Sequence, residues 1–213
     1  MKNKIAQVVV DLPVEGPFDY EIPSTLSWPL AVGQRVLVSF HTKTVIGYVV
    51  GLKATSAFKR LKPILSVLDK DPVLSSFLLD LAKEFSFDHC CSLGQAIATF
   101  LPAYFRKTKK EIIFSLPAGQ EEERLSPETL LLQDVSLKNF WPAVIERIRQ
   151  VTAKKASVII LVPENDRIDW ALKELRGCGI NEPIATLDKQ RPDKAQLKDW
   201  VFVKEGKARI VVG

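Results

Sequence analysis

The segments "GQRVLVSF" (residues 33–40) and "TVIGYVVGL" (44–52) decide how the first part of the chain folds. Both are short runs rich in β-branched residues, and comparable runs stand at 5–13, 18–23 and 61–68. Pro, Gly, Ser and Lys separate these runs, which is the pattern of short strands joined by turns. The sequence therefore predicts a small curved β-sheet or barrel.

Two helices are expected after these strands. In "PVLSSFLLDLAKEFSFDHC" (72–90) the apolar residues recur every three to four positions, and "LGQAIATFLP" (93–102) reads as a shorter helix that stops at Pro102. Strands followed by helices in one stretch predict an α+β domain over residues 1–105.

The second half of the chain has another organisation. Residues 106–127 lose periodicity and gain charge, so we interpret them as a linker. From residue 128 onward helical and strand patterns alternate, with helices expected near 141–152, 166–177 and 193–206 and strands near 156–164, 183–188 and 208–213. This alternation predicts a parallel α/β segment over 128–213.

Composition limits the classes of protein. The 213 residues are 46% hydrophobic, enough to fill a core, whereas the longest apolar runs, such as "SVIILVP" (157–163), are far shorter than the roughly 20 residues of a membrane span. No signal-peptide pattern is seen at the N-terminus, so a cytoplasmic protein is expected. The three cysteines and two histidines lack metal-ligand spacing, so we expect neither zinc nor another cofactor in this chain.

The excess positive charge lies in the first half. Residues 1–110 contain 14 Lys and Arg against nine Asp and Glu, while residues 111–213 contain 16 of each kind. The basic residues gather beside aromatic ones in "FKRLK" (58–62) and "FRKTKK" (105–110). A solvated face accounts for such runs about as well as a function does. The functional hypothesis is single-stranded nucleic acid, whose bases stack on rings and whose phosphates pair with Lys59, Arg60, Arg106 and Lys107.

The ordered blocks "VVVDLPVEGPFDYEIP", "GQRVLVSF", "IGYVVGL", "LKPILSVLDKDPVL" and "DHCCSLGQAIATFLPAYFR" resemble the N-terminal 3′-DNA-binding domain of the PriA family, the replication-restart helicases also called primosomal protein N′. The resemblance covers about half of the chain. The second half is similar to the first helicase lobe of that family, with "VIILVPE" at the place of its Ia motif and "ARIVVG" as a later strand.

The resemblance implies a pocket for the 3′-terminal nucleotide of a nascent strand. The matching positions are Phe18, Asp19, Tyr20 and Lys62, and His41 stands where the family usually has glycine. An acid suits this task because it accepts a hydrogen bond from a 3′-hydroxyl and repels a terminal phosphate. The alternative is structural. In an extended strand Phe18 and Tyr20 share one face, so both rings would pack in the core while Asp19 takes the other face.

The resemblance also implies an ATP site, and here the sequence departs from the family. The segment "LLLQDVSLKNFWPAV" (130–144) holds no glycine, and its Lys138 precedes Asn139 rather than Ser or Thr, so it cannot form the phosphate cradle of a Walker A loop. The Asp-Glu motif for magnesium is not in the chain either. We therefore expect no ATP hydrolysis by this chain, with ATP, magnesium and zinc confined to full-length relatives.

Three functions stay open at this stage. The first is a DNA-binding protein of replication restart that recognises the 3′ end of a nascent strand at stalled or forked DNA during primosome assembly. The second is an ATP-dependent 3′-to-5′ helicase of which this chain is an N-terminal fragment. The third is a non-catalytic scaffold that contacts single-strand-binding protein or other primosome proteins.

Overall fold

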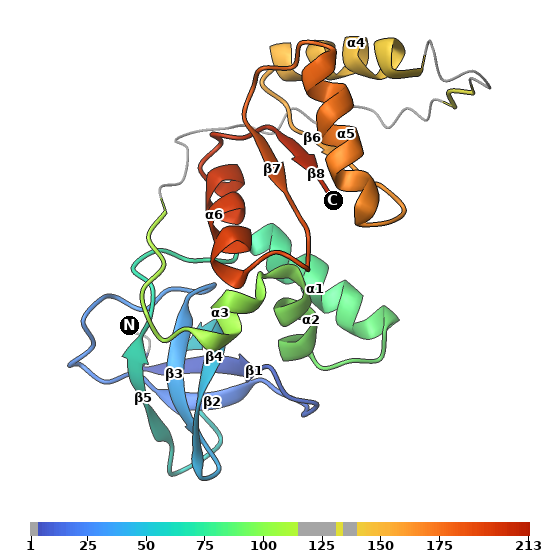
Figure 1. Cartoon of the computed structure of the whole chain (residues 1–213). Coiled ribbons are helices and arrows are strands. Elements are labelled where there is room, and N and C mark those ends of the chain that lie inside the picture. The colour runs from blue at the N-terminus through green and yellow to red at the C-terminus, as the bar shows by residue number, and fades with distance from the viewer. Residues whose placement is uncertain (1–3, 115–130, 134–139) are drawn as a thin grey trace. The chain divides into compact units, whose positions relative to one another are not determined.

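The computed structural model describes residues 4–114, 131–133 and 140–213 (Figure 1). These belong to two compact units, Met1–Ile113 and Phe114–Gly213, which are treated separately below. Most of the predicted linker, residues 115–127, lies outside the described residues, as do positions 134–139 of the segment that replaces the Walker A loop.

The first unit contains a closed five-stranded barrel in the order β1-β2-β5-β3-β4. Its strands are β1 (Ile5–Val10), β2 (Phe18–Glu21), β3 (Arg35–Phe40), β4 (Lys43–Lys53) and β5 (Lys62–Val67). The β2–β5 pair is parallel and the other pairs are antiparallel. The barrel predicted from the β-branched runs is thus confirmed.

The barrel core follows from the two-residue period of its strands. Val36 and Val38 of β3, Val49 of β4 and Tyr20 of β2 are buried together inside the barrel. The residues next to them in sequence point the other way. Barrel positions outside this core are buried as well, Arg35 and Tyr48 among them.

Three helices complete the first unit, where the sequence predicted two. They are α1 (Ser76–Asp88), α2 (Leu93–Phe100) and the short α3 (Ala103–Lys107). Helix α1 begins later than the predicted segment because the Ser75 hydroxyl accepts a hydrogen bond from the Leu78 N–H and caps it there. A capping box of Ser92 and Gln95 starts α2. The extra helix α3 follows Pro102, whose fixed φ suits a helix start.

A buried ion pair ties the end of the first unit to the barrel. The Arg35 Nε and Nη2 donate to the two Asp69 carboxylate oxygens at 2.6 and 2.7 Å. The other three guanidinium N–H groups donate to the carbonyls of Phe105, Thr108 and Lys110. The Ile112 N–H in turn donates to Asp69 Oδ1 at 3.1 Å. Residues 105–112 are therefore held against the barrel, and residues 106–112 of the predicted linker are part of the first unit.

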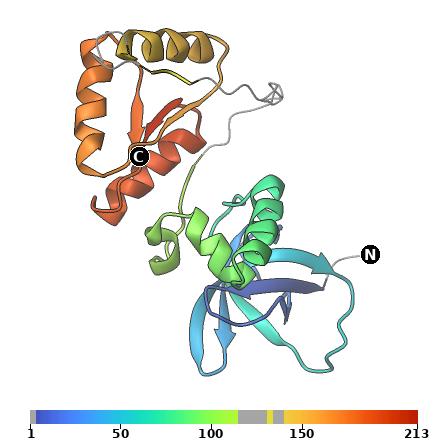
Figure 2. The ribbon, with the colours of Figure 1, turned by 90° about the vertical axis from the view of Figure 1, so that its right-hand side faces the viewer.

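The second unit is built on a three-stranded parallel sheet in the order β6-β8-β7. Its elements are α4 (Phe140–Ala153), β6 (Val158–Ile160), α5 (Asp166–Gly177), β7 (Ile184–Thr186), α6 (Asp193–Lys204) and β8 (Ile210–Val212). Helices α4 and α5 pack on the face that carries Ile210 and Val212, and α6 packs on the face of Val211 (Figure 2). The predicted alternation of helices and parallel strands is thus observed.

Among the described residues no helix is both long enough and apolar enough to cross a membrane.

Candidate nucleic-acid interface

The predicted pocket residues come from three elements of the barrel: the strand β2, the β3–β4 turn and the start of β5. The Lys62 Nζ donates to the His41 carbonyl at 3.0 Å, which joins β5 to the turn. The Phe18 ring meets the Phe40 ring edge to face at 5.1 Å between centroids, and Phe40 meets His41 in the same way at 4.8 Å. Phe18, His41 and Lys62 are therefore brought together, with Phe40 between the first two.

Tyr20 belongs to the barrel core. Its side chain is buried among the core valines, and its hydroxyl donates to the Ser39 carbonyl at 3.2 Å. Burial raises the pKa of this phenol above its ordinary value, so it stays a neutral donor. The predicted pocket role thus does not fit Tyr20, because its ring is part of the core against which Phe18 packs and its hydroxyl is bonded to β3.

Asp19 lies on the opposite face of β2. The strand pairs with β1 from Ile5–Glu21 to Val8–Phe18 without a register shift, so no bulge turns Asp19 toward the two rings. Its Oδ2 accepts from Lys53 Nζ at 2.8 Å and from the Ser56 hydroxyl. The Asp19 side chain is only 6% exposed.

These contacts keep Asp19 ionised. Burial by itself would raise the pKa of the carboxyl, but the hydrogen bonds from Lys53 and Ser56 and the charge of Lys53 outweigh it, and the pKa lies below its ordinary value. Both contacts are made to Oδ2, and a carboxylate has about four acceptor positions. Oδ1 therefore keeps the capacity to accept a further hydrogen bond.

His41 has a backbone conformation that glycine adopts more easily. Its φ is 49°, in the left-handed region. This explains in physical terms why glycine is expected at the matching position. The His41 side chain is exposed at the turn, and its ring stands edge to face beside the Phe40 ring.

The predicted phosphate-contacting residues fall in two places. Lys59 and Arg60 lie in the exposed loop between β4 and β5 beside Phe58, which is 70% exposed. The Ser56 hydroxyl links this loop to Asp19, since it also accepts the Phe58 N–H at 3.2 Å. Arg106 and Lys107 end helix α3, where Arg106 Nη1 lies 3.5 Å from Asp11 Oδ2.

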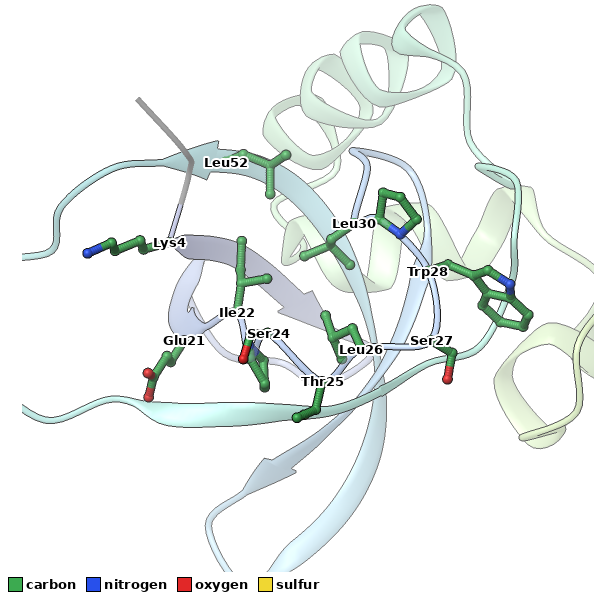
Figure 3. A pocket seen from close by; sticks show the side chains of 12 residues that line it. Lys4, Glu21, Ile22, Ser24, Thr25, Leu26, Ser27, Trp28, Leu30 and Leu52 are labelled. Atoms are coloured by element: carbon green, nitrogen blue, oxygen red, sulfur yellow. The ribbon is translucent and has the colours of Figure 1, made fainter.

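A cavity of about 930 Å³ lies beside the loop that follows β2. Ile22, Leu26 and Leu30 line it, with Lys4 and Glu21 at one side and Trp28 at the other (Figure 3). The five predicted pocket residues are not among the described residues around it. This cavity is therefore separate from the predicted site.

Three residues of this interface were missed by sequence reasoning: Phe40, Lys53 and Ser56. Phe40 ends an alternating strand directly before His41. Its position next to the turn could therefore have predicted that it lies beside His41. Lys53 and Ser56 are 34 and 37 positions from Asp19 and meet it only because β4 and β2 both pair with β1. No local sequence pattern predicts a contact between residues so far apart in the chain.

A small barrel that gathers aromatic and basic side chains at one end defines a class of single-strand nucleic-acid-binding module. Residues 7–102 match the sequence family of the PriA 3′ DNA-binding domain (3′BD). The first unit therefore carries a domain that matches this family.

Relatives with the name "Replication restart protein PriA" agree with this assignment. The Bacillus subtilis protein is 31% identical over 140 residues, which cover 61% of this chain and 17% of the relative. The Treponema pallidum protein is 28% identical over 231 aligned positions, covering 97% of this chain and 35% of the relative. The Chlamydia trachomatis protein is 31% identical over 173 residues, or 73% and 23% respectively. The chain thus spans about a third or less of the length of these relatives.

Proposed function

We propose that this chain binds DNA in replication restart and recognises the 3′ end of the nascent strand at a stalled or forked junction. The observation that carries the proposal is the match of residues 7–102 to the 3′ DNA-binding domain family, because it covers most of β1, the other four barrel strands and helices α1 and α2. The cluster of Phe18, His41 and Lys62 at one barrel end supports it.

In this proposal the terminal base stacks at Phe18, whose ring is half-buried and so already held in place. Lys62 donates to the His41 carbonyl and keeps a positive charge at the rim, where it offsets the last phosphate. The aromatic cluster thereby positions the end of the strand, and Lys62 adds affinity without sequence information.

Asp19 contacts the strand end from the opposite face of β2, through its Oδ1. The ionised carboxylate accepts a hydrogen bond from a free 3′-hydroxyl, and Lys53 and Ser56 hold it in one orientation. A 3′-phosphate offers no equivalent donor and brings like charge. Discrimination between the two ends therefore depends on the charge of one residue.

The test compares forked DNAs that end at the junction in a 3′-hydroxyl or a 3′-phosphate, at one fixed salt concentration. One charge-assisted hydrogen bond contributes about 1.5–3 kcal/mol, so the hydroxyl-ended fork should bind about tenfold more tightly or better. Asp19→Asn should erase most of this difference and bind the phosphate-ended fork equally or more tightly.

Lys62→Ala is the matched control for a contact that carries no end information. It should weaken binding of both forks alike and flatten the salt dependence of binding. Equal affinity of the unmodified protein for the two forks would refute end recognition by Asp19, and absence of fork binding would refute the DNA-binding proposal as a whole.

A second candidate function is supported by the second unit. Its parallel sheet flanked by helices and the alignment of 97% of the chain to the Treponema pallidum relative favour a segment of a helicase lobe. The glycine-free segment 130–144 argues against ATP use by that segment. We therefore rank DNA binding in primosome assembly above helicase activity. We propose single-strand-binding protein as a candidate partner and the cytoplasm as the compartment.

A further inference from the structure

A second cavity, of about 290 Å³, opens on the barrel unit where β1 ends and α3 ends. Its charged lining consists of Asp11, Arg106, Lys107 and Lys109. Three cations against one carboxylate give the lining a net positive charge. None of the residues predicted for the 3′-end pocket is among the described residues that line it.

Tyr48 also lines this cavity, and its hydroxyl is the unusual feature. The residue lies on β4 and is 1% exposed. Within the described part of the chain the hydroxyl has no hydrogen-bond partner. A buried polar group without a partner costs free energy, so such a group in a native structure calls for an explanation.

Burial keeps the Tyr48 hydroxyl in its neutral form. It raises the pKa of the phenol far above its ordinary value, and the charges of Arg35, Asp11 and Arg106 act on it more weakly than burial does. The hydroxyl therefore stays protonated and offers a neutral O–H donor at the cavity wall.

We propose that this cavity binds a backbone phosphate of the DNA, with the Tyr48 hydroxyl donating to a phosphate oxygen and Arg106 and Lys109 supplying the opposite charge. This inference rests on the proposed DNA-binding function and adds a second contact away from the strand end. A hydroxyl donor beside guanidinium and ammonium groups matches the acceptor-only, anionic surface of a phosphate.

The position of the cavity favours a phosphate that belongs to DNA over a free anion. The basic run continues past the cavity through Lys110 on a segment that Arg35 holds in place. A line of cations on a fixed segment suits a polymer with regularly repeated charges. The Asp11 carboxylate repels an anion in this cavity. A bound phosphate would compete with Asp11 for Arg106, whose Nη1 lies 3.5 Å from Asp11 Oδ2.

The test is Tyr48→Phe, which removes the hydroxyl and keeps the ring. Fork affinity should fall about tenfold or more, equally for hydroxyl-ended and phosphate-ended forks, because the contact carries no end information. The slope of affinity against salt should stay the same, since no charge is removed. The melting temperature of the free protein should be unchanged or higher, because an unpartnered buried hydroxyl is lost.

Tyr104→Phe is the matched control, since Tyr104 is not among the lining residues, and its fork affinity should equal that of the unmodified protein. Asp11→Asn should bind both forks about threefold more tightly, because it removes the carboxylate that repels phosphate and releases Arg106.

Several results would overturn the inference. One is an unchanged fork affinity of Tyr48→Phe while the unmodified protein binds the fork, which would leave the proposed function standing. Another is a lower melting temperature of Tyr48→Phe, which would show an internal partner for the hydroxyl. A third comes from inorganic phosphate: if it raises the melting temperature of the unmodified protein and not of Tyr48→Phe, while fork affinities are equal, the site takes a free phosphate instead of DNA.

Discussion

His41 combines an exposed side chain with a φ of 49° at the β3–β4 turn. Its functional contact is made by the backbone, since Lys62 donates to its carbonyl. The ring contact with Phe40 depends on the side chain instead. A residue with this backbone conformation carries strain of about 1–2 kcal/mol unless it is glycine, and a β-branched residue tolerates the conformation poorly.

We expect His41→Gly to keep the stability of the first unit within about 0.5 kcal/mol, because relief of the backbone strain offsets the greater entropy of the unfolded glycine chain. His41→Val should lower stability by about 1 kcal/mol or more. Urea unfolding of both variants measures the difference. If His41→Val is as stable as His41→Gly, the turn does not hold this residue in the left-handed region.

At the scale of elements, the packing of α2 on β1 depends on Gly94. A Cβ built at this position would lie 1.8 Å from the Val10 carbonyl oxygen and 2.5 Å from its carbon. Neither atom belongs to a flexible side chain, so the helix itself would have to move. The helix backbone thus lies directly on the strand, and this contact fixes the height of α2 above the barrel.

Gly94→Ala should destabilise the first unit by about 3 kcal/mol or more, because the helix must shift or the strand must bend. Gly177→Ala is the matched control, since nothing lies within 4 Å of a Cβ at this position in α5. It should leave the unfolding of the first unit unchanged. Thermal unfolding followed by circular dichroism checks both, and equal melting curves would show that α2 has room to move.

At the scale of the whole chain, the hydrogen bonds of the Arg35–Asp69 pair determine how long a fragment must be for the first unit to be stable. A fragment of residues 1–113 keeps all five guanidinium hydrogen bonds, whereas a fragment of residues 1–105 loses the carbonyls of Thr108 and Lys110 and the Ile112 N–H. We expect the shorter fragment to be less stable by about 3 kcal/mol or more, because buried charged groups lose partners. The midpoints of urea unfolding of the two fragments test this prediction. Equal midpoints would mean that residues 106–113 do not stabilise the first unit.

The whole chain should not bind ATP, with or without magnesium. Residues 130–144 contain no glycine, and Lys138 is not followed by Ser or Thr, so this sequence lacks the residue types that a phosphate-binding loop needs. Isothermal titration calorimetry should show no saturable heat in the presence or absence of forked DNA. Saturable binding at micromolar ATP would show that a nucleotide site lies elsewhere in the chain.

The sequence by itself determined most elements of both units and some features of the site. Short β-branched runs between turn residues predicted the barrel strands because a barrel core needs one apolar residue in every two. The same period offered Tyr20 inside and Asp19 outside as the structural alternative, whereas the resemblance favoured a pocket that included both residues; the structure buries Tyr20 in the core. Helix α3 was missed because five residues are too few to show a helical period.

Only the tertiary structure decided which residues meet. Closing the barrel brings Lys53 and Ser56 to Asp19, and it places Phe40 between Phe18 and His41. It also buries Arg35 against Asp69 and leaves the Tyr48 hydroxyl at the wall of a basic cavity. The physical reason is that strand register and closure bring together residues tens of positions apart, whereas periodicity reports only on which side of its own strand a residue lies.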